Sequence, residues 1–148
     1  MKMDLSIVPY GMLSGVLLHV LPYLKVSEDW SKGRASVDDI LRFLFTGQMQ
    51  LWIALDDTKI YGHIITEVKQ YPQCKMLVIQ YCAGESNHMQ FVEEKAYEIL
   101  ERFAKDNGCA GIELIGRPGW SRHVAKQGFN TKSVMYQKFF ERGKDEPK

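Results

Sequence analysis

The feature that most constrains this chain is a strand, a long helix and a second strand in direct succession. Nearly every residue of Met76–Tyr81 is apolar, which is typical of a central strand covered on both faces. Asn87 can cap a helix that runs from about His88 to Asn107, and Gly111–Ile115 is a second strand of the buried type. Because a connecting helix of this length returns the chain to the end of the sheet where the first strand began, the two strands are predicted to be parallel.

The rest of the chain supplies antiparallel strands and shorter helices. Ser36–Asp39 has the pattern of a capping box and predicts the start of a helix. Asp56–Lys59 is a polar turn between two apolar runs and predicts an antiparallel hairpin. The other expected elements are a strand at Leu5–Val8, a helix at Gly11–Leu24, a loop at Ser27–Ala35, hairpin strands at Leu51–Leu55 and Ile60–Val68, a short helix from Pro118 to Gly128 and an extended strand at Phe129–Phe140.

These elements follow one another as β-α-α-β-β-β-α-β-α-β. The order predicts one α/β domain over residues 1–140, with a mixed, mostly antiparallel sheet, a central parallel strand pair and flanking helices. Residues 141–148 are mostly charged and are expected to form a loose tail. A length of 148 residues suits one domain, which would bury about 70% of its extended-chain surface.

Composition and charge narrow the class of protein. The chain is 45% hydrophobic and 25% charged, and its formal net charge is +1. These values are ordinary for a soluble domain and give no support to a broad electrostatic grip on nucleic acid or on a membrane. Cys74, Cys82 and Cys109 fit no zinc pattern, and the four histidines have no metal-ligand spacing. Gly11–Leu24 is too short to cross a bilayer and no cleavage site follows it, so a cytoplasmic protein is expected.

From Leu51 to Phe129 the sequence resembles the GNAT superfamily of acyl-CoA-dependent N-acyltransferases. The resemblance is carried by the strand and turn at Leu77–Gly84, the long helix, the strand at Ile112–Ile115 and the Gly128-Phe129 pair, which matches the close of the family's last helix. The phrase Gly-Arg-Pro-Gly-Trp at Gly116–Trp120 is similar to short GNAT-like proteins of bacteriophages and prophages. The order of elements extends the resemblance over nearly the whole chain and implies the GNAT fold and an acyltransferase activity.

The resemblance also implies where acetyl-CoA would bind. In the family two parallel strands separate, the pantetheine arm lies between them, and the pyrophosphate rests on backbone amides at the start of the long helix. Those amides lack partners within the helix, and the helix dipole favours an anion there. The corresponding loop in this chain is Gly84–Met89. The implied cofactor-binding residues are Ile79, Tyr81, Gly84, Ser86, Asn87, His88, Met89 and Arg117.

Two positions depart from the family pattern. The phosphate loop has a single glycine, no lysine or arginine, and a carboxylate at Glu85 that would repel a pyrophosphate unless it points away. A plain helix cap is the alternative interpretation of this loop. Val124 stands where many family members carry the tyrosine that protonates the leaving thiolate. His123 is adjacent, but one residue along a helix turns a side chain by about 100°.

Side chains at three places in the chain are candidates for proton transfer. Glu67 lies late in the second hairpin strand, where a carboxylate could remove the proton of an ammonium acceptor; an exposed strand residue is the alternative. Tyr81 and Cys82 end the central strand, and one of them should face the gap because side chains alternate; packing is the alternative for both. His123 is the third candidate, as a replacement for the missing acid.

Two functions follow from these observations. The first is transfer of an acetyl group from acetyl-CoA to an amine of a protein or a small molecule, with atypical or weak activity. The second is a non-catalytic GNAT-fold protein that acts as a binding or structural module, for instance in a phage particle. In either case the apolar Val134–Phe140 segment offers a strand for pairing in a homodimer.

Overall fold

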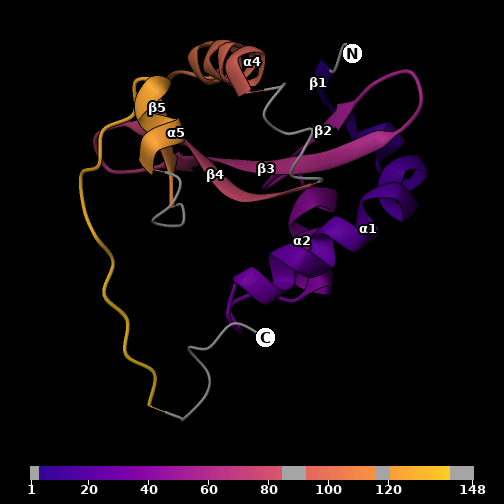
Figure 1. The fold of residues 1–148 in the computed structure, drawn as a ribbon, viewed down its shortest axis with the longest axis horizontal. Coiled ribbons are helices and arrows are strands. Elements are labelled where there is room, and N and C mark those ends of the chain that lie inside the picture. Colours follow the sequence, from indigo (N-terminus) through magenta and orange to yellow (C-terminus); the bar gives the residue numbers. More distant parts are fainter. Residues whose placement is uncertain (1–3, 85–92, 116–120, 141–148) are drawn as a thin grey trace.

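A computed structural model describes residues 4–84, 93–115 and 121–140 of the chain. Its centre is one five-stranded sheet in which the strands follow in sequence order from β1 to β5 (Figure 1). Neighbouring strands are antiparallel except β4 and β5, which are parallel. The strands are β1 (Asp4–Ile7), β2 (Gln50–Leu55), β3 (Ile60–Gln70), β4 (Lys75–Gly84) and β5 (Cys109–Leu114).

Helices cover both faces of this sheet. The long helix α4 lies on one face, and α1 and α2 lie on the other (Figure 1). The helical elements are a 3-10 turn at Tyr10–Met12, α1 (Leu13–Trp30), α2 (Val37–Phe45), α4 (Glu93–Asp106) and α5 (Ser121–Lys126). The predicted α/β fold, with a mixed sheet, a parallel strand pair and flanking helices, is therefore confirmed; within the described residues the parallel pair lies at the β5 edge of the sheet.

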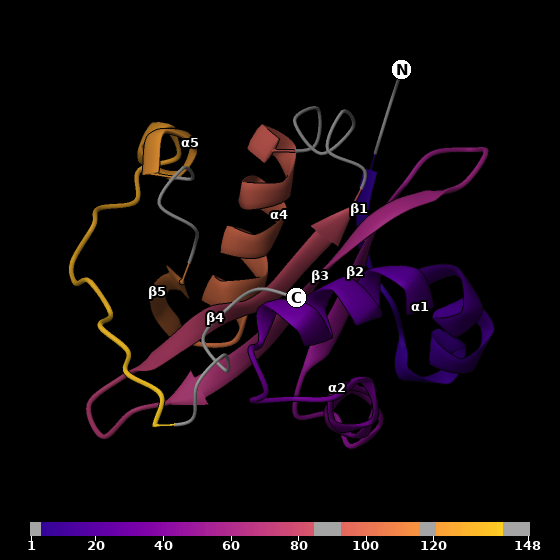
Figure 2. The same ribbon diagram turned by 60° about the horizontal axis from the view of Figure 1, so that its bottom comes forward.

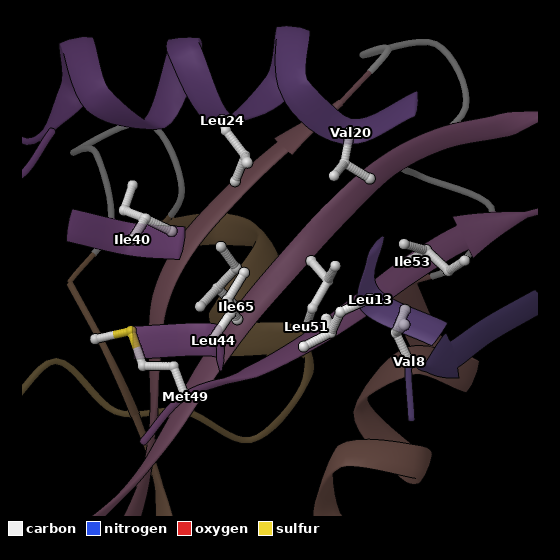
Figure 3. Packing of buried hydrophobic residues seen from close by; sticks show 10 residues of the cluster. All are labelled: Val8, Leu13, Val20, Leu24, Ile40, Leu44, Met49, Leu51, Ile53 and Ile65. Atoms are coloured by element: carbon white, nitrogen blue, oxygen red, sulfur yellow. The ribbon is translucent and has the colours of Figure 1, made fainter. Parts of the chain in front are cut away.

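Apolar side chains form a separate core on each face of the sheet. On one face, Leu100 of α4 packs with Trp52 of β2 and Leu77 of β4. On the other face, Leu24 of α1 and Leu44 of α2 belong to a cluster with side chains of β2 and β3 (Figure 3). Alternation along the strands delivers apolar side chains to both faces, and this explains why the central strands are apolar almost throughout.

The capping box that the sequence predicts at Ser36 is present. The Ser36 hydroxyl accepts a hydrogen bond from the Asp39 amide at 3.1 Å, and the Asp39 carboxylate accepts one from the Ser36 amide at 3.0 Å. Together these bonds satisfy two backbone N–H groups at the helix start. The same bonds, with the Arg42 guanidinium nearby, hold the pKa of the Asp39 carboxyl below its usual value.

Replacing Ser36 with Ala is expected to lower the free energy of unfolding by about 1 kcal/mol, because one amide at the start of α2 loses its partner. The melting temperature should fall by about 3 °C. Thermal unfolding followed by circular dichroism measures the change, with Ser14→Ala on the exposed side of α1 as the matched control. Equal melting temperatures for the two variants would show that the box contributes nothing to stability.

The first helix is longer than the sequence predicts. The chain was expected to form a loop from Ser27, but α1 continues to Trp30. Ser27 is 3% exposed and packs against the sheet, on the same side of α1 as Val20 and Leu24. Tertiary contacts therefore extend the helix beyond its last apolar turn. Pro22 lies on the exposed side, where water can bind the carbonyl that proline leaves without an amide partner.

The strand predicted at Phe129–Phe140 is absent, and that prediction is wrong for this structure. The segment is extended but joins no sheet, and β5 pairs only with β4 among the described residues. Contacts hold its two ends: the Phe129 ring lies 5.4 Å from the Tyr97 ring, and the Arg34 guanidinium lies 5.6 Å from the Phe139 ring. Apolar alternation alone does not make a strand when no edge pairs with it. Homodimer formation through Val134–Phe140 stays a prediction.

Candidate functional site

The parallel strands β4 and β5 part in the middle of β4. Their pairing runs from Lys75 and Cys109 to its last pair, Ile79 with Leu114. β4 then continues for five residues, Gln80–Gly84; the last four of them pair with β3, and none pairs with another strand of the described chain (Figure 2). One edge of this segment therefore carries backbone N–H and C=O groups that can bind an extended ligand.

A bulge in β4 lies at the point where the strands part. Thr66 of β3 pairs with Ile79, and the next β3 residue, Ile65, pairs with Tyr81, so Gln80 is the extra residue. Ile79 packs on the α4 side of the sheet, whereas Tyr81 packs on the α1 and α2 side. A bulge interrupts alternation in this way and re-aims the side chains that follow it.

Glu67 of β3 lies next to the bulge. The side-chain amide of Gln80 donates a hydrogen bond of 2.9 Å to Oε1 of Glu67. The side-chain amide of Gln48, in the turn before β2, donates one of 3.3 Å to Oε2. Glu67 is partly exposed, so its carboxylate is oriented by two neutral donors and remains open to solvent.

Tyr81 lies on the same side of the sheet as Glu67. Its side chain is half-buried, and its pKa is raised above the ordinary value of 10.0. Burial is the main cause, and the negative charges of Asp39 and Glu67 add to it. The phenol is therefore protonated at neutral pH and can donate a proton. Of the two residues expected to end the central strand, Tyr81 faces α1 and α2, and Cys82 packs on the α4 side.

The structure thus brings together two of the predicted catalytic residues, Glu67 and Tyr81. Ile79 is the last β4 residue paired with β5, and Gly84 is the exposed last residue of β4. His123 belongs to α5, but its side chain lies outside the described part of the chain. Five predicted cofactor contacts also lie outside the described residues: Ser86, Asn87, His88, Met89 and Arg117.

The end of α5 matches the Gly-Phe close that the sequence indicates. Gly128 has a φ of +88°, a left-handed conformation that favours glycine. The amide of Phe129 donates to the carbonyl of Val124 at 3.1 Å. The Val124 side chain is partly buried and apolar, so it cannot donate a proton.

His63 of β3 is a buried polar residue that the sequence did not single out. It has no exposed surface, its Nε2 lies 3.2 Å from Oγ of Ser27, and its Nδ1 has no hydrogen-bond partner among the described residues. Burial lowers its pKa to about 4. The imidazole is therefore neutral at pH 7 and contributes no charge to the adjacent face of the sheet.

The described residues contain no group of side chains that could hold a metal ion. None of the helices in this part of the chain is long and apolar enough to cross a membrane. Two surface hollows lie away from Glu67: one is lined by the outer residues of α4, and the other lies at the β1–β2 edge.

Comparison with solved structures identifies the fold. The structure matches glucosamine-6-phosphate N-acetyltransferase from Arabidopsis thaliana with a TM-score of 0.65 and 15% identity, over 95% of this chain and 100% of that one. It matches a predicted acetyltransferase with acetyl-CoA from Clostridium acetobutylicum with a TM-score of 0.66 and 12% identity, over 93% and 96%. It also matches an aminoglycoside acetyltransferase from an uncultured soil metagenomic sample, in complex with sisomicin, with a TM-score of 0.67 and 12% identity, over 94% and 97%.

The chain therefore has the GNAT fold, with the parting strands that the resemblance implies. No protein-family model and no curated protein matches the sequence. At these identities the likeness to solved structures shows the fold alone, and chemistry has to be argued from the residues of this chain.

Proposed function

We propose that the protein transfers an acetyl group from acetyl-CoA to the amine of a small molecule. The observation that carries the proposal is the parting of β4 from β5 directly beside Glu67 and Tyr81. A pantetheine arm contains two amides, and the edge of Gln80–Gly84 offers the complementary backbone groups. The described residues therefore fit the cofactor's arm, and its thioester would supply the acetyl group at the bulge.

Glu67 and Tyr81 can carry two of the proton transfers that amide formation needs. An amine acceptor arrives as an ammonium ion, and the Glu67 carboxylate accepts its proton directly or through water and passes it to solvent. Attack of the neutral amine on the thioester carbonyl would then form the C–N bond and break the C–S bond, and the nitrogen would release a second proton to solvent. The Tyr81 phenol, which is protonated at neutral pH, donates a proton to the departing sulfur and regains one from solvent.

The charge of Glu67 favours a cationic acceptor. Its two described donors, Gln48 and Gln80, are neutral amides and leave its negative charge uncompensated. An ammonium group is attracted to such a carboxylate, whereas a phosphate group is repelled. We therefore expect an amine with further positive charges, of the kind that aminoglycosides carry, to be a better acceptor than a phosphorylated amino sugar.

A thiol-release assay tests the proposal. The protein is mixed with acetyl-CoA and, in turn, sisomicin, a linear polyamine and glucosamine 6-phosphate, and free CoA is measured over time. We expect release with at least one of the two cationic amines, and the acetylated product should appear in mass spectra. An absence of CoA release above the rate without protein, for every amine at millimolar concentration, would contradict the proposal.

Replacing Tyr81 with Phe removes the proposed proton donor and keeps the ring. We expect kcat to fall by at least about 10-fold, because a positioned acid contributes up to about 10²- to 10⁴-fold. The melting temperature should stay nearly unchanged. Tyr71→Phe, at the far end of the hairpin, is the matched control. Unchanged kcat in Tyr81→Phe would mean that the thiolate takes its proton directly from solvent.

A non-catalytic binding protein of the same fold is the second candidate function. Apolar Val124 at the family's acid position and Glu85 in the phosphate loop favour it. The short phage-encoded proteins that Gly116–Trp120 resembles would fit such a role. The thiol-release assay distinguishes the two functions, because only the first consumes acetyl-CoA. A cytoplasmic location stays a prediction for both.

A further inference from the structure

The geometry points to Gln80 as a positioning residue that orients the carboxylate of Glu67 toward the amine acceptor. The inference rests on the proposed acetyl transfer and assigns a role to a residue that the sequence pattern did not indicate. The bulge inserts Gln80 into β4 one residue beyond Ile79, the last β4 residue that pairs with β5.

The hydrogen bonds leave Glu67 both oriented and available. Each carboxylate oxygen accepts one described hydrogen bond, from Gln80 to Oε1 and from Gln48 to Oε2. An ionised carboxylate has about four lone-pair sites, so the described donors leave two for an ammonium group or a water molecule. Glutamate has high rotamer freedom, and these two bonds restrict it to one orientation while the side chain stays partly exposed.

The two glutamines are not equivalent. Gln80 is partly buried in a long strand whose neighbouring residues pair with β3, and its bond to Glu67 is 2.9 Å. Gln48 is exposed in the turn after α2, and its bond is 3.3 Å. The shorter bond from the better-anchored donor should control the orientation of the carboxylate, and Gln48 provides a matched control.

A neutral donor suits this role for an electrostatic reason. A lysine or arginine at position 80 would also bind Glu67, but its positive charge would compete with a cationic acceptor. A carboxamide donates the same hydrogen bond and leaves the net charge of the carboxylate in place. Gln80 can thus fix the direction of Glu67 without weakening its attraction for an ammonium group.

Gln80→Met is the main test, because methionine has nearly the same shape and no donor. With the best amine acceptor, we expect kcat/KM to fall by about 10-fold or more, since misplaced catalytic groups cost at least this much. Binding of acetyl-CoA by calorimetry should be unchanged. Gln48→Met should have a much smaller effect on kcat/KM.

A purely structural role for Gln80 predicts different results. It would lower stability in Gln80→Met and lower activity equally in the wild-type and Glu67→Gln backgrounds. Positioning instead requires the effect of Gln80→Met on activity to vanish once the carboxylate is gone. Equal effects in both backgrounds would overturn the inference.

A second measurement serves if Gln80→Met does not fold. The side-chain amide signals of Gln80 in ¹H–¹⁵N spectra should differ between the wild-type protein and Glu67→Gln. The side-chain amide signals of Gln70 should be the same in both proteins. Unshifted Gln80 amide signals would overturn the inference without an activity assay. Absence of acetyl transfer in the wild-type protein, with the Gln80 signals shifted, would instead contradict the proposed function and leave the contact established.

Discussion

Replacing Glu67 with Gln is expected to lower kcat/KM for acetyl transfer by about 100-fold or more. The substitution keeps the shape of the side chain and removes its ability to accept a proton, and a positioned general base contributes about 10²- to 10⁴-fold. Steady-state kinetics with the acceptor found in the thiol-release assay measures the change.

Glu101→Gln is the matched control for this substitution. Glu101 is exposed on the outer side of α4, away from the sheet. The substitution Glu101→Gln removes the same charge from the protein but lies away from the β4 bulge. If both variants lost activity equally, net charge would explain the effect. Wild-type activity in Glu67→Gln would remove Glu67 from the mechanism.

Acidification from pH 7 to pH 5 is expected to lower the free energy of unfolding by about 2 kcal/mol through His63 alone. The pKa of His63 is about 4 in the folded protein, below the 6.5 that is ordinary for histidine. The unfolded chain therefore binds a proton first, and stability that is complete above pH 6.5 is lost as the pH falls toward 4. The physical cause is burial, since a charged imidazole has no compensating partner at Nδ1 within the described structure.

Urea unfolding of wild-type protein and of His63→Leu at pH 7 and pH 5 isolates this contribution. The variant has its own cost at both pH values, so the comparison is the change with pH within each protein. Carboxyl groups such as Asp56 also titrate, but hydrogen bonds from Thr58 and Tyr61 hold its pKa well below the usual value. Its contribution therefore falls below the pH window of His63. Equal pH dependence in the two proteins would mean that the pKa of His63 does not fall on folding.

Local patterns predicted the parts of the fold that local interactions determine. The capping box at Ser36 and the turn at Asp56–Lys59 depend on residues two or three positions apart, and both are present. The parallel pairing of β4 and β5 followed from the connecting helix alone. The extension of α1 to Trp30 depends on contacts of Ser27 with the sheet, which no window of the sequence contains.

The site was predictable to the extent that strand alternation holds. Glu67 and Tyr81 were identified from their places near strand ends, and the structure puts them on one side of the sheet. Gln80 was missed because a bulge changes the direction of side chains without a sequence signal, and in a regular strand Gln80 and Tyr81 would face opposite sides. The loop Glu85–Met89 and Arg117 lie outside the described residues, so their contacts with CoA stay predictions.

Calorimetric titration with acetyl-CoA tests the central claim, that the parted strands form an acyl-CoA site, most directly. We predict saturable binding of one molecule per chain, with a dissociation constant between about 1 µM and 1 mM, the range of typical enzyme KM values. In ¹H–¹⁵N spectra the same titration should move the backbone amides of Gln80–Gly84, and those of β1 at the opposite edge should stay in place. An absence of binding at millimolar acetyl-CoA would contradict the account.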